Sequence, residues 1–259
     1  MSATAVRVSP EWLVLREPAD AAARSGELAA RLRRHLPASG RLVIHDLGGG
    51  SGAMGRWLAP RLRGPQHWVV HDRDPDLLEL AAVAPPRAAA VTVETRRSDV
   101  TRLSRDELAG ADLITASALL DLLTADELAG MLGACSGRPL LLELTVAGRV
   151  ALSPAEPLDA RIEAAFNAHQ RRGGLLGPDA VAAAVDALRG AEVLVRPSPW
   201  RLDASHADLA AEWLRGWVGA ACEQEPALSA DAYLRRRLAQ AAAGELAVTV
   251  DHADLLVLP

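Results

Sequence analysis

The alternation of apolar and polar positions predicts strands and helices in turn between residues 41 and 146. Short apolar runs begin near residues 42, 67, 91, 111 and 138, and the segments between them carry apolar residues at helical spacing. Such an alternation is typical of a parallel sheet covered by helices. The fifth run, RPLLLELTV at 138–146, is apolar almost throughout, as expected for a strand buried on both faces.

After residue 146 the regular alternation is predicted to stop. One helix is expected near 156–171, followed by a Gly-rich bend and a further helix that starts at Gly177 to Asp179. EVLVRP at 192–197 predicts a sixth strand. Two helical segments, near 206–221 and 230–242, precede GELAVTVDHADLLVLP, which predicts a seventh strand running antiparallel to the others. The fold class is therefore α/β: a doubly wound, mostly parallel seven-stranded sheet with helices on both faces and an antiparallel last strand.

Residues 9–36 are predicted to be helical. Ser9 and Pro10 suit an N-cap and a first helical position, and Pro18 is expected to divide the segment into two helices. Residues 1–37 are accordingly assigned to an N-terminal helical segment, which is either a lid over a site or a helix packed on the sheet edge. Residues 38–259 are assigned to the sheet domain, with helical insertions near 150–176 and 204–243.

Composition narrows the classes of function. The chain has 259 residues, half of them apolar, a net charge of −5 and no lysine, so lysine-dependent pyridoxal phosphate and P-loop chemistry are excluded. The charge argues against a nucleic-acid partner. Cys135 and Cys222 lack metal-ligand spacing, and His45 and His71, inside apolar strands, are typical of core residues, so no metal is predicted. Without an h-region or a membrane span in the sequence, we expect a cytoplasmic protein with no membrane partner.

The segment RLVIHDLGGGSGAMG at 41–55 predicts a strand, a tight glycine turn and a helix. The glycines permit positive φ angles and a close approach of a ligand to the main chain. Gly50, Gly52 and Gly55 spell G-x-G-x-x-G, the dinucleotide fingerprint. Asp46, Gly48, Gly50 and Gly52 spell D-x-G-x-G-x-G, which resembles the first motif of class I S-adenosylmethionine (SAM) dependent methyltransferases.

Charge favours the second pattern. A dinucleotide places a pyrophosphate over this turn, where Asp46 repels it, whereas SAM places an ammonium and a sulfonium there. Asp72 ends the second predicted strand, where an acid can accept both ribose hydroxyls. Asp99 and Val100 follow the third strand and resemble the methyltransferase segment that contacts adenine.

The resemblance implies that SAM lies across the carboxyl ends of the first and fourth strands and leaves as S-adenosylhomocysteine (SAH). Gly48, Gly50 and Gly52 are then expected to face its methionine portion, together with Asp46. By position alone, the remaining cofactor contacts are expected from Asp72 at the ribose, Arg73, Asp99 and Val100 at the adenine, and Ala116 and Ser117 at the end of the fourth strand.

On the acceptor side, His169 is the candidate general base, in the segment after the fifth strand where family members build substrate pockets. Arg24, Arg171 and Arg172 are candidates for holding an anionic substrate, and Asp121 is a further candidate contact. An exposed helix-end histidine is an equally good interpretation of His169, and a solvated basic face is the favoured interpretation of the arginines. The predicted activity is methyl transfer to a small molecule such as a secondary metabolite or a small acid.

Two other functions stay open. One is an NAD(P)-dependent oxidoreductase using the turn Gly50/Gly52/Gly55, and the other is a SAM-binding protein without catalysis. The sequence leaves open whether the protein is a homo-oligomer.

Overall fold

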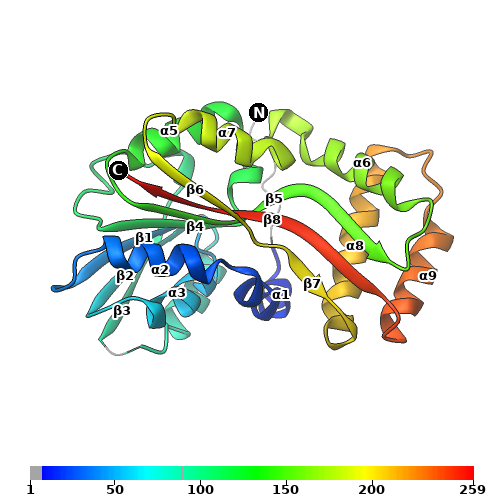
Figure 1. The fold of residues 1–259 in the computed structure, drawn as a ribbon, viewed down its shortest axis with the longest axis horizontal. Helices are drawn as coiled ribbons and strands as arrows, with labels where there is room; N and C mark the ends of the chain where they lie inside the picture. The colour runs from blue at the N-terminus through cyan, green and yellow to red at the C-terminus, as the bar shows by residue number, and fades with distance from the viewer. Residues whose placement is uncertain (1–7, 89) are drawn as a thin grey trace.

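An eight-stranded mixed sheet runs through the whole molecule in a computed structural model that describes residues 8–88 and 90–259 (Figure 1). Its order is β3-β2-β1-β4-β5-β8-β6, with β7 paired to β8. The strands β1 to β5 are parallel, and β8 runs antiparallel to β5, β6 and β7. The strands are β1 (Leu42–Leu47), β2 (Gln66–Asp72), β3 (Val91–Arg97), β4 (Leu113–Ser117), β5 (Leu140–Ser153), β6 (Glu192–Pro197), β7 (Trp200–Leu202) and β8 (Ala247–Leu258).

The predicted doubly wound sheet with an antiparallel last strand is confirmed. The prediction did not include β7, because a three-residue strand with only Trp200 and Leu202 buried has too short a pattern to recognise. The helices are α1 (Pro10–Ala23), α2 (Gly26–His35), α3 (Ala53–Leu58), α4 (Pro75–Val83), α5 (Ala125–Cys135), α6 (Asp159–Gln170), α7 (Ala180–Ala187), α8 (Ala207–Gln224) and α9 (Asp231–Ala242). None of the described helices is long and apolar enough to cross a membrane.

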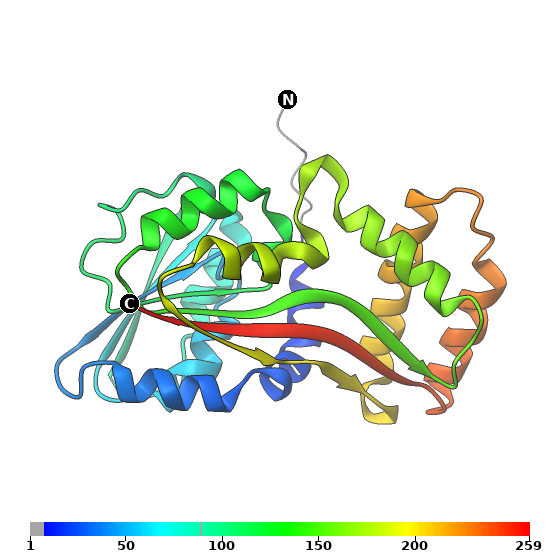
Figure 2. The same cartoon turned by 45° about the horizontal axis from the view of Figure 1, so that its top comes forward.

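Helices cover both faces of the sheet, as Figure 2 shows. On one face, α2 and α3 bury Leu28, Met54 and Trp57 against Ile44 and Leu141 of the strands. On the other face, a separate core packs α5 and α7 against the strand residues that alternate with those of the first core, such as Leu140 and Leu142 on either side of Leu141. Because successive side chains of a strand point to opposite faces, each central strand contributes to both cores.

A third core lies beyond the end of the parallel sheet, to the right in Figure 1. There α6, α8 and α9 pack on the extensions of β5 and β8, which are 14 and 12 residues long. The fifth strand was predicted to end at residue 146, but β5 continues to Ser153. The reason is a pairing invisible in local sequence: residues 150–153 of β5 pair with residues 247–250 of β8.

The N-terminal segment forms two helices, but the break is not at Pro18, which lies inside α1. Pro18 lacks the N–H that a helical hydrogen bond requires, but the packing of Leu15 and Ala19 against the third core keeps α1 helical on both sides of it. The chain breaks instead after Ala23, because the backbone N–H of Ser25 donates to Asp254 at 2.7 Å rather than continuing the helix. The predicted cap at Ser9 is confirmed, and residues 1–7 lie outside the described residues.

Candidate functional site

The glycine turn between β1 and α3 adopts a backbone that side chains rarely permit. Gly48, Gly50 and Gly52 have φ angles of 63°, 52° and 81°. A Cβ at Gly49 would lie 2.5 Å from a carboxylate oxygen of Asp46. Three positions therefore require glycine for conformation and a fourth for space.

Polar side chains occupy the carboxyl end of the sheet on the face covered by α2 and α3. Asp46 of β1, Thr115 of β4, Glu143 of β5 and Asp254 of β8 each lie two positions from an apolar residue of the core on that face. All four are at most 1% exposed. Asp46 pairs in register with Thr115, whose hydroxyl donates to it at 2.7 Å. We call these four residues the acidic row.

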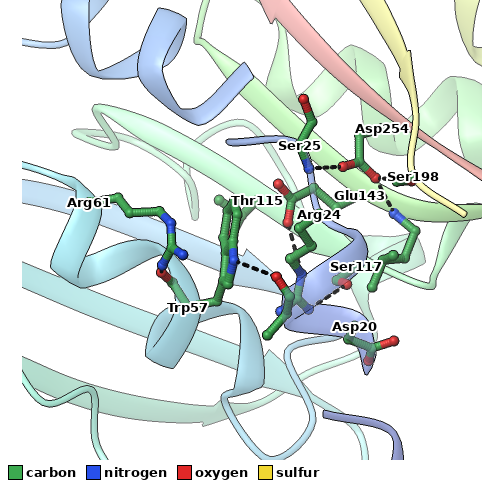
Figure 3. Close-up of polar contacts among 12 residues, drawn as sticks. Asp20, Arg24, Ser25, Trp57, Arg61, Thr115, Ser117, Glu143, Ser198 and Asp254 are labelled. Carbon is green, nitrogen blue, oxygen red and sulfur yellow. Dashed lines mark hydrogen bonds and ion pairs between the residues drawn. The ribbon is translucent and has the colours of Figure 1, made fainter. Parts of the chain in front are cut away.

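A β-bulge sets the direction of Glu143. The register between β5 and β8 shifts between Leu142 and Thr145, and Leu144 has a φ of 55°. Asp254 holds this backbone by accepting the Leu144 N–H at 2.8 Å. The same carboxylate accepts from the Ser198 hydroxyl at 2.6 Å and from the Ser25 N–H at 2.7 Å (Figure 3). Asp254 therefore joins the bulge to the junction between α1 and α2.

Arg24, which ends α1, reaches into the acidic row (Figure 3). Its Nη2 donates to the Ser117 hydroxyl at 3.0 Å, and its Nε lies 2.9 Å from Glu143 Oε2. The residue is only 6% exposed, and its Nη1 is buried without a hydrogen-bond partner. The guanidinium thus connects the N-terminal helix to the ends of β4 and β5.

Burial controls the charge of the row. It raises the pKa of Asp46 to about 7, against opposing effects of the Thr115 hydrogen bond and the Arg24 charge. Burial also raises the pKa of Glu143 well above its ordinary value and raises that of Asp254. The positive charge of Arg24 lowers the pKa of all three carboxyl groups and so opposes the effect of burial. A further cation beside them would favour their ionised forms.

Asp72, the predicted ribose ligand, lies against the glycine turn. Its Oδ2 accepts the Gly50 N–H at 2.9 Å, and its Oδ1 accepts the Asp74 N–H at 2.9 Å. The structure therefore brings the ends of β1 and β2 together, as the predicted site requires. The ribose role stays a prediction.

The predicted adenine segment follows β3. Asp99 accepts from both the N–H and the hydroxyl of Thr101, and Arg73 lies 3.8 Å from the same carboxylate. Val100 is 5% exposed. These residues lie together beside the end of β2, where the Ser98 N–H donates to the Asp72 carbonyl.

His45 of β1 and His71 of β2 are core residues, as expected. His45 Nδ1 lies 3.0 Å from His71 Nε2, and the second ring nitrogen of His71 lies 2.9 Å from the Ser98 hydroxyl. Burial lowers the pKa of both histidines to about 4. They are therefore neutral near pH 7.

The candidates after β5 already have protein partners. His169 Nε2 lies 3.1 Å from Glu223, and the Arg172 side chain lies 3.5 Å from the same carboxylate. Arg171 forms a bidentate pair with Asp179 at 2.6 and 2.8 Å. The structure groups these residues at the end of α6, whereas Arg24 lies apart from them, against Glu143 of the acidic row.

Asp121 lies in a 3₁₀ turn after β4 and is 6% exposed. Burial raises its pKa to about 6, and its Oδ1 has no hydrogen-bond partner.

Ala116 lies in β4, and its side chain packs in the core on the face covered by α5 and α7. Only its backbone is therefore available at the end of the strand. Ala118 has a φ of 50°, a strained conformation for a residue with a side chain.

Helix α1 contacts the glycine turn directly. Leu13 lies 3.7 Å from the position of a Cβ on Gly50. Glu17 accepts from Arg56 Nε and Nη2, each at 2.7 Å, and Arg56 Nη1 donates to the Ser51 carbonyl. Whether this segment moves as a lid stays a prediction.

Sequence reasoning missed Glu143, Asp254 and Thr115. A signal was present for the two acids, because Glu143 interrupts the apolar run LLLELTV and Asp254 directly precedes the apolar run LLVL. A charged residue in a fully buried strand requires a partner. The partner of Glu143 lies 119 positions away, at Arg24, where local sequence does not reveal it.

A scan against protein-family models and a search of curated proteins both found no match. Among solved structures, the chain is similar to the cyclopropane synthase MmaA2 from Mycobacterium tuberculosis, with a TM-score of 0.50 and 14% identity over 97% of this chain and 95% of that one. A SAM-dependent methyltransferase from Thiobacillus denitrificans in complex with SAH has a TM-score of 0.47 and 15% identity, covering 98% and 100%. At these identities the likeness concerns the fold. The predicted doubly wound α/β fold is confirmed, and the chain shares it with the cyclopropane synthase MmaA2.

Proposed function

We propose that this protein transfers a methyl group from SAM to a small-molecule acceptor. The observation that carries the proposal is the acidic row beside the glycine turn, with Asp46 fully buried. Carboxyl groups in that position repel a pyrophosphate and favour a ligand that brings an ammonium and a sulfonium. The same charges disfavour the alternative of a nicotinamide dinucleotide bound at Gly50, Gly52 and Gly55.

The residues at the strand ends fit SAM along its length. Each carboxylate oxygen of Asp72 accepts one backbone N–H and retains a lone pair for a ribose hydroxyl. Asp99 and Val100 form the adenine end, with Arg73 beside them. Gly48 and Ser117 border the methionine end, where the turn and β4 meet.

SAM supplies an activated methyl group that an acceptor lone pair attacks in line with the breaking carbon–sulfur bond. The main work of the protein is then to orient the two reactants, which is worth up to about 7 to 11 kcal/mol in favourable cases. Where the acceptor must lose a proton, His169 is the proposed base, oriented by Glu223 in the way that a carboxylate orients catalytic histidines. Asp121, Arg171 and Arg172 are proposed as acceptor contacts.

Calorimetric titration with SAH and with NAD⁺ tests the proposal. We expect binding of SAH and not of NAD⁺. The variant Asp72→Ala is expected to bind SAH about 10- to 100-fold more weakly, because a hydrogen bond to a charged group contributes roughly 1.5 to 3 kcal/mol. Asp106→Ala, in an exposed turn, is the control. Binding of NAD⁺ instead of SAH would refute the proposal.

A screen of candidate acceptors with labelled SAM separates the enzyme from a non-catalytic SAM-binding protein. Transfer of label to a small molecule supports the proposed activity. Stable SAM binding with no transfer to any acceptor, together with a protein partner that binds only the loaded form, would favour the non-catalytic alternative.

A further inference from the structure

Asp121 is a buried carboxyl group that the protein leaves partly unpaired. It lies in the 3₁₀ turn Leu120–Leu122, directly after β4, and is 6% exposed. Its Oδ1 is buried without a hydrogen-bond partner. Because buried polar atoms are normally satisfied, this oxygen indicates a ligand that brings a hydrogen-bond donor.

The turn that carries Asp121 lies against the glycine turn. The Ala118 N–H donates to the Glu143 carbonyl at 2.9 Å, which fixes the chain beside the end of β5. Leu119 then packs on Gly48, where a Cβ would lie 3.1 Å from the leucine Cδ1. Asp121 follows directly in this turn, so it lies at the carboxyl end of the sheet, where SAM is proposed to bind.

Two other segments of the acceptor side approach the same turn. The chain after α6 pairs with it, because the Leu176 N–H donates to the Leu123 carbonyl at 2.8 Å. Helix α1 is within electrostatic reach, since the charge of Arg16 acts on Asp121. The free oxygen of Asp121 therefore belongs to the region that α1, the end of α6 and the end of β4 border.

The arginines of this region already have acidic partners, whereas Asp121 has no basic one within hydrogen-bond distance. Of the side chains of Arg16, Asp121, His169, Arg171 and Arg172, only that of Asp121 has a buried polar atom without a partner. The charge that is left over on the acceptor side is thus negative, and it disfavours an acid as the acceptor. The pairs are Arg16 with Asp20, Arg171 with Asp179, and Arg172 with Glu223, which also contacts His169.

Asp121 is separate from the acids beside the cofactor. Its neighbours Leu120 and Leu123 pack in the core on the face covered by α5 and α7, whereas the acidic row lies on the face covered by α2 and α3. The cofactor ammonium already has Asp46 as its neighbour on that second face. A donor that reaches Asp121 is therefore assigned to the acceptor.

We propose that Asp121 selects an acceptor that carries an amine, whose N–H groups its carboxylate binds, so that the preferred substrate is a base and not an acid. This inference deepens the proposed function and rests on it. Burial raises the pKa of Asp121 to about 6, so the carboxyl group is mostly ionised at pH 7 and can bind a cation. Asp121 is flanked by two leucines on each side in the chain, which favours an amine attached to an apolar body.

The test uses the full-length protein saturated with SAH and three probes that share an aromatic body: 2-phenylethylamine, 2-phenylethanol and 3-phenylpropanoate. By calorimetry, the wild-type protein is expected to bind the amine about 10- to 100-fold more tightly than the alcohol, the range for a charge-assisted hydrogen bond. The acid should bind more weakly than either. In Asp121→Asn the preference for the amine over the alcohol should fall below about threefold.

Asp126→Asn is the matched control. Asp126 lies nearby in the chain, exposed in the first turn of α5, and its loss should leave the preference unchanged. A pH series on the wild-type protein covers the case in which Asp121→Asn does not fold. Between about pH 5 and 8 the amine stays protonated, so its preference over the alcohol should rise through about pH 6 as Asp121 ionises.

Each outcome decides for or against the inference. Equal binding of amine and alcohol by the wild-type protein, tighter binding of the acid, binding of none of the probes, or an undiminished preference in Asp121→Asn would overturn it and leave the methyltransferase proposal standing. Weaker SAH binding by Asp121→Asn with an unchanged preference for the amine would also overturn it, and would assign Asp121 to the cofactor. Failure of the wild-type protein to bind SAH would refute the proposed function itself.

Discussion

Replacing Asp254 by alanine should destabilise the protein more than most single substitutions. The carboxylate is fully buried and accepts three hydrogen bonds, from the Leu144 N–H, the Ser25 N–H and the Ser198 hydroxyl. A buried donor left without an acceptor costs about 1 to 3 kcal/mol. The Ser198 hydroxyl can rotate toward another acceptor, whereas the two backbone N–H groups cannot.

The two fixed donors give a loss of about 2 to 6 kcal/mol. Burying the Asp254 carboxyl group is itself unfavourable, as its raised pKa indicates, so removing that group offsets part of this loss. We therefore expect the free energy of unfolding to fall by about 3 kcal/mol. The variant should also loosen the bulge at Leu144 and the start of α2, since Asp254 is the common acceptor of both.

Urea unfolding at pH 7 measures the effect through the midpoint and the extrapolated free energy. Asp251→Ala is the matched control, because Asp251 lies on the same strand but its side chain is 39% exposed and lies 3.9 Å from Arg149. Such surface pairs contribute about 0 to 1 kcal/mol. A loss below about 1 kcal/mol for Asp254→Ala, equal to that of the control, would refute the account of the bulge.

Two further predictions follow from the glycine turn and from Asp46. Gly49→Ala should lower the free energy of unfolding by about 1 to 3 kcal/mol, because its Cβ meets Asp46 Oδ2 at 2.5 Å and Val70 at 2.7 Å. Gly26→Ala, whose Cβ meets nothing within 4 Å, is the control, and equal melting temperatures by calorimetry would contradict the prediction. SAH affinity should rise with pH through about 7, because burial raises the pKa of Asp46 to about 7 and the ammonium binds its ionised form. Titrations in buffers of different ionisation enthalpy should show proton release below pH 7, and affinity independent of pH would contradict this.

The protonation of Asp46 also makes the stability of the folded protein depend on pH, in the opposite direction to the SAH affinity. The pKa of Asp46 in the folded protein, about 7, lies above its ordinary value of 3.8. Its contribution to stability is therefore fully present below about pH 4 and is lost as the pH rises toward 7. Raising the pH toward 7 therefore lowers the stability of the free protein and increases the fraction of Asp46 that is ionised and able to bind a cation.

The sequence was sufficient to predict the parts of the site that are local in the chain. The glycine turn, the acid that precedes it and Asp72 follow from strand and turn patterns spanning a few residues each. The helix break at Pro18 was predicted wrongly because packing retained α1 through the proline. The acceptor of the Ser25 N–H, Asp254, lies 229 positions away and set the true break.

The acidic row was not predictable as a unit. Its members come from four strands, and only the register of the sheet places Asp46 next to Thr115 and Glu143 next to Ser117. The extension of β5 likewise depends on β8, the last strand of the chain. Local patterns identify such strands, but the partners of their polar residues depend on long-range pairing.

The long strands β5 and β8 have a mechanical consequence. Both belong to the sheet that carries Glu143 and Asp254, and both continue beneath α6 and α8, although the pairing of β5 with β8 shifts register between Leu142 and Thr145 and again between Val146 and Val150. Strand backbone therefore joins the helices α6 and α8 to the parallel part of the sheet along β5 and β8, and the two register shifts are the irregular points of this connection. A displacement of these helices has to be carried along the backbone of β5 and β8, the strands that hold Glu143 and Asp254.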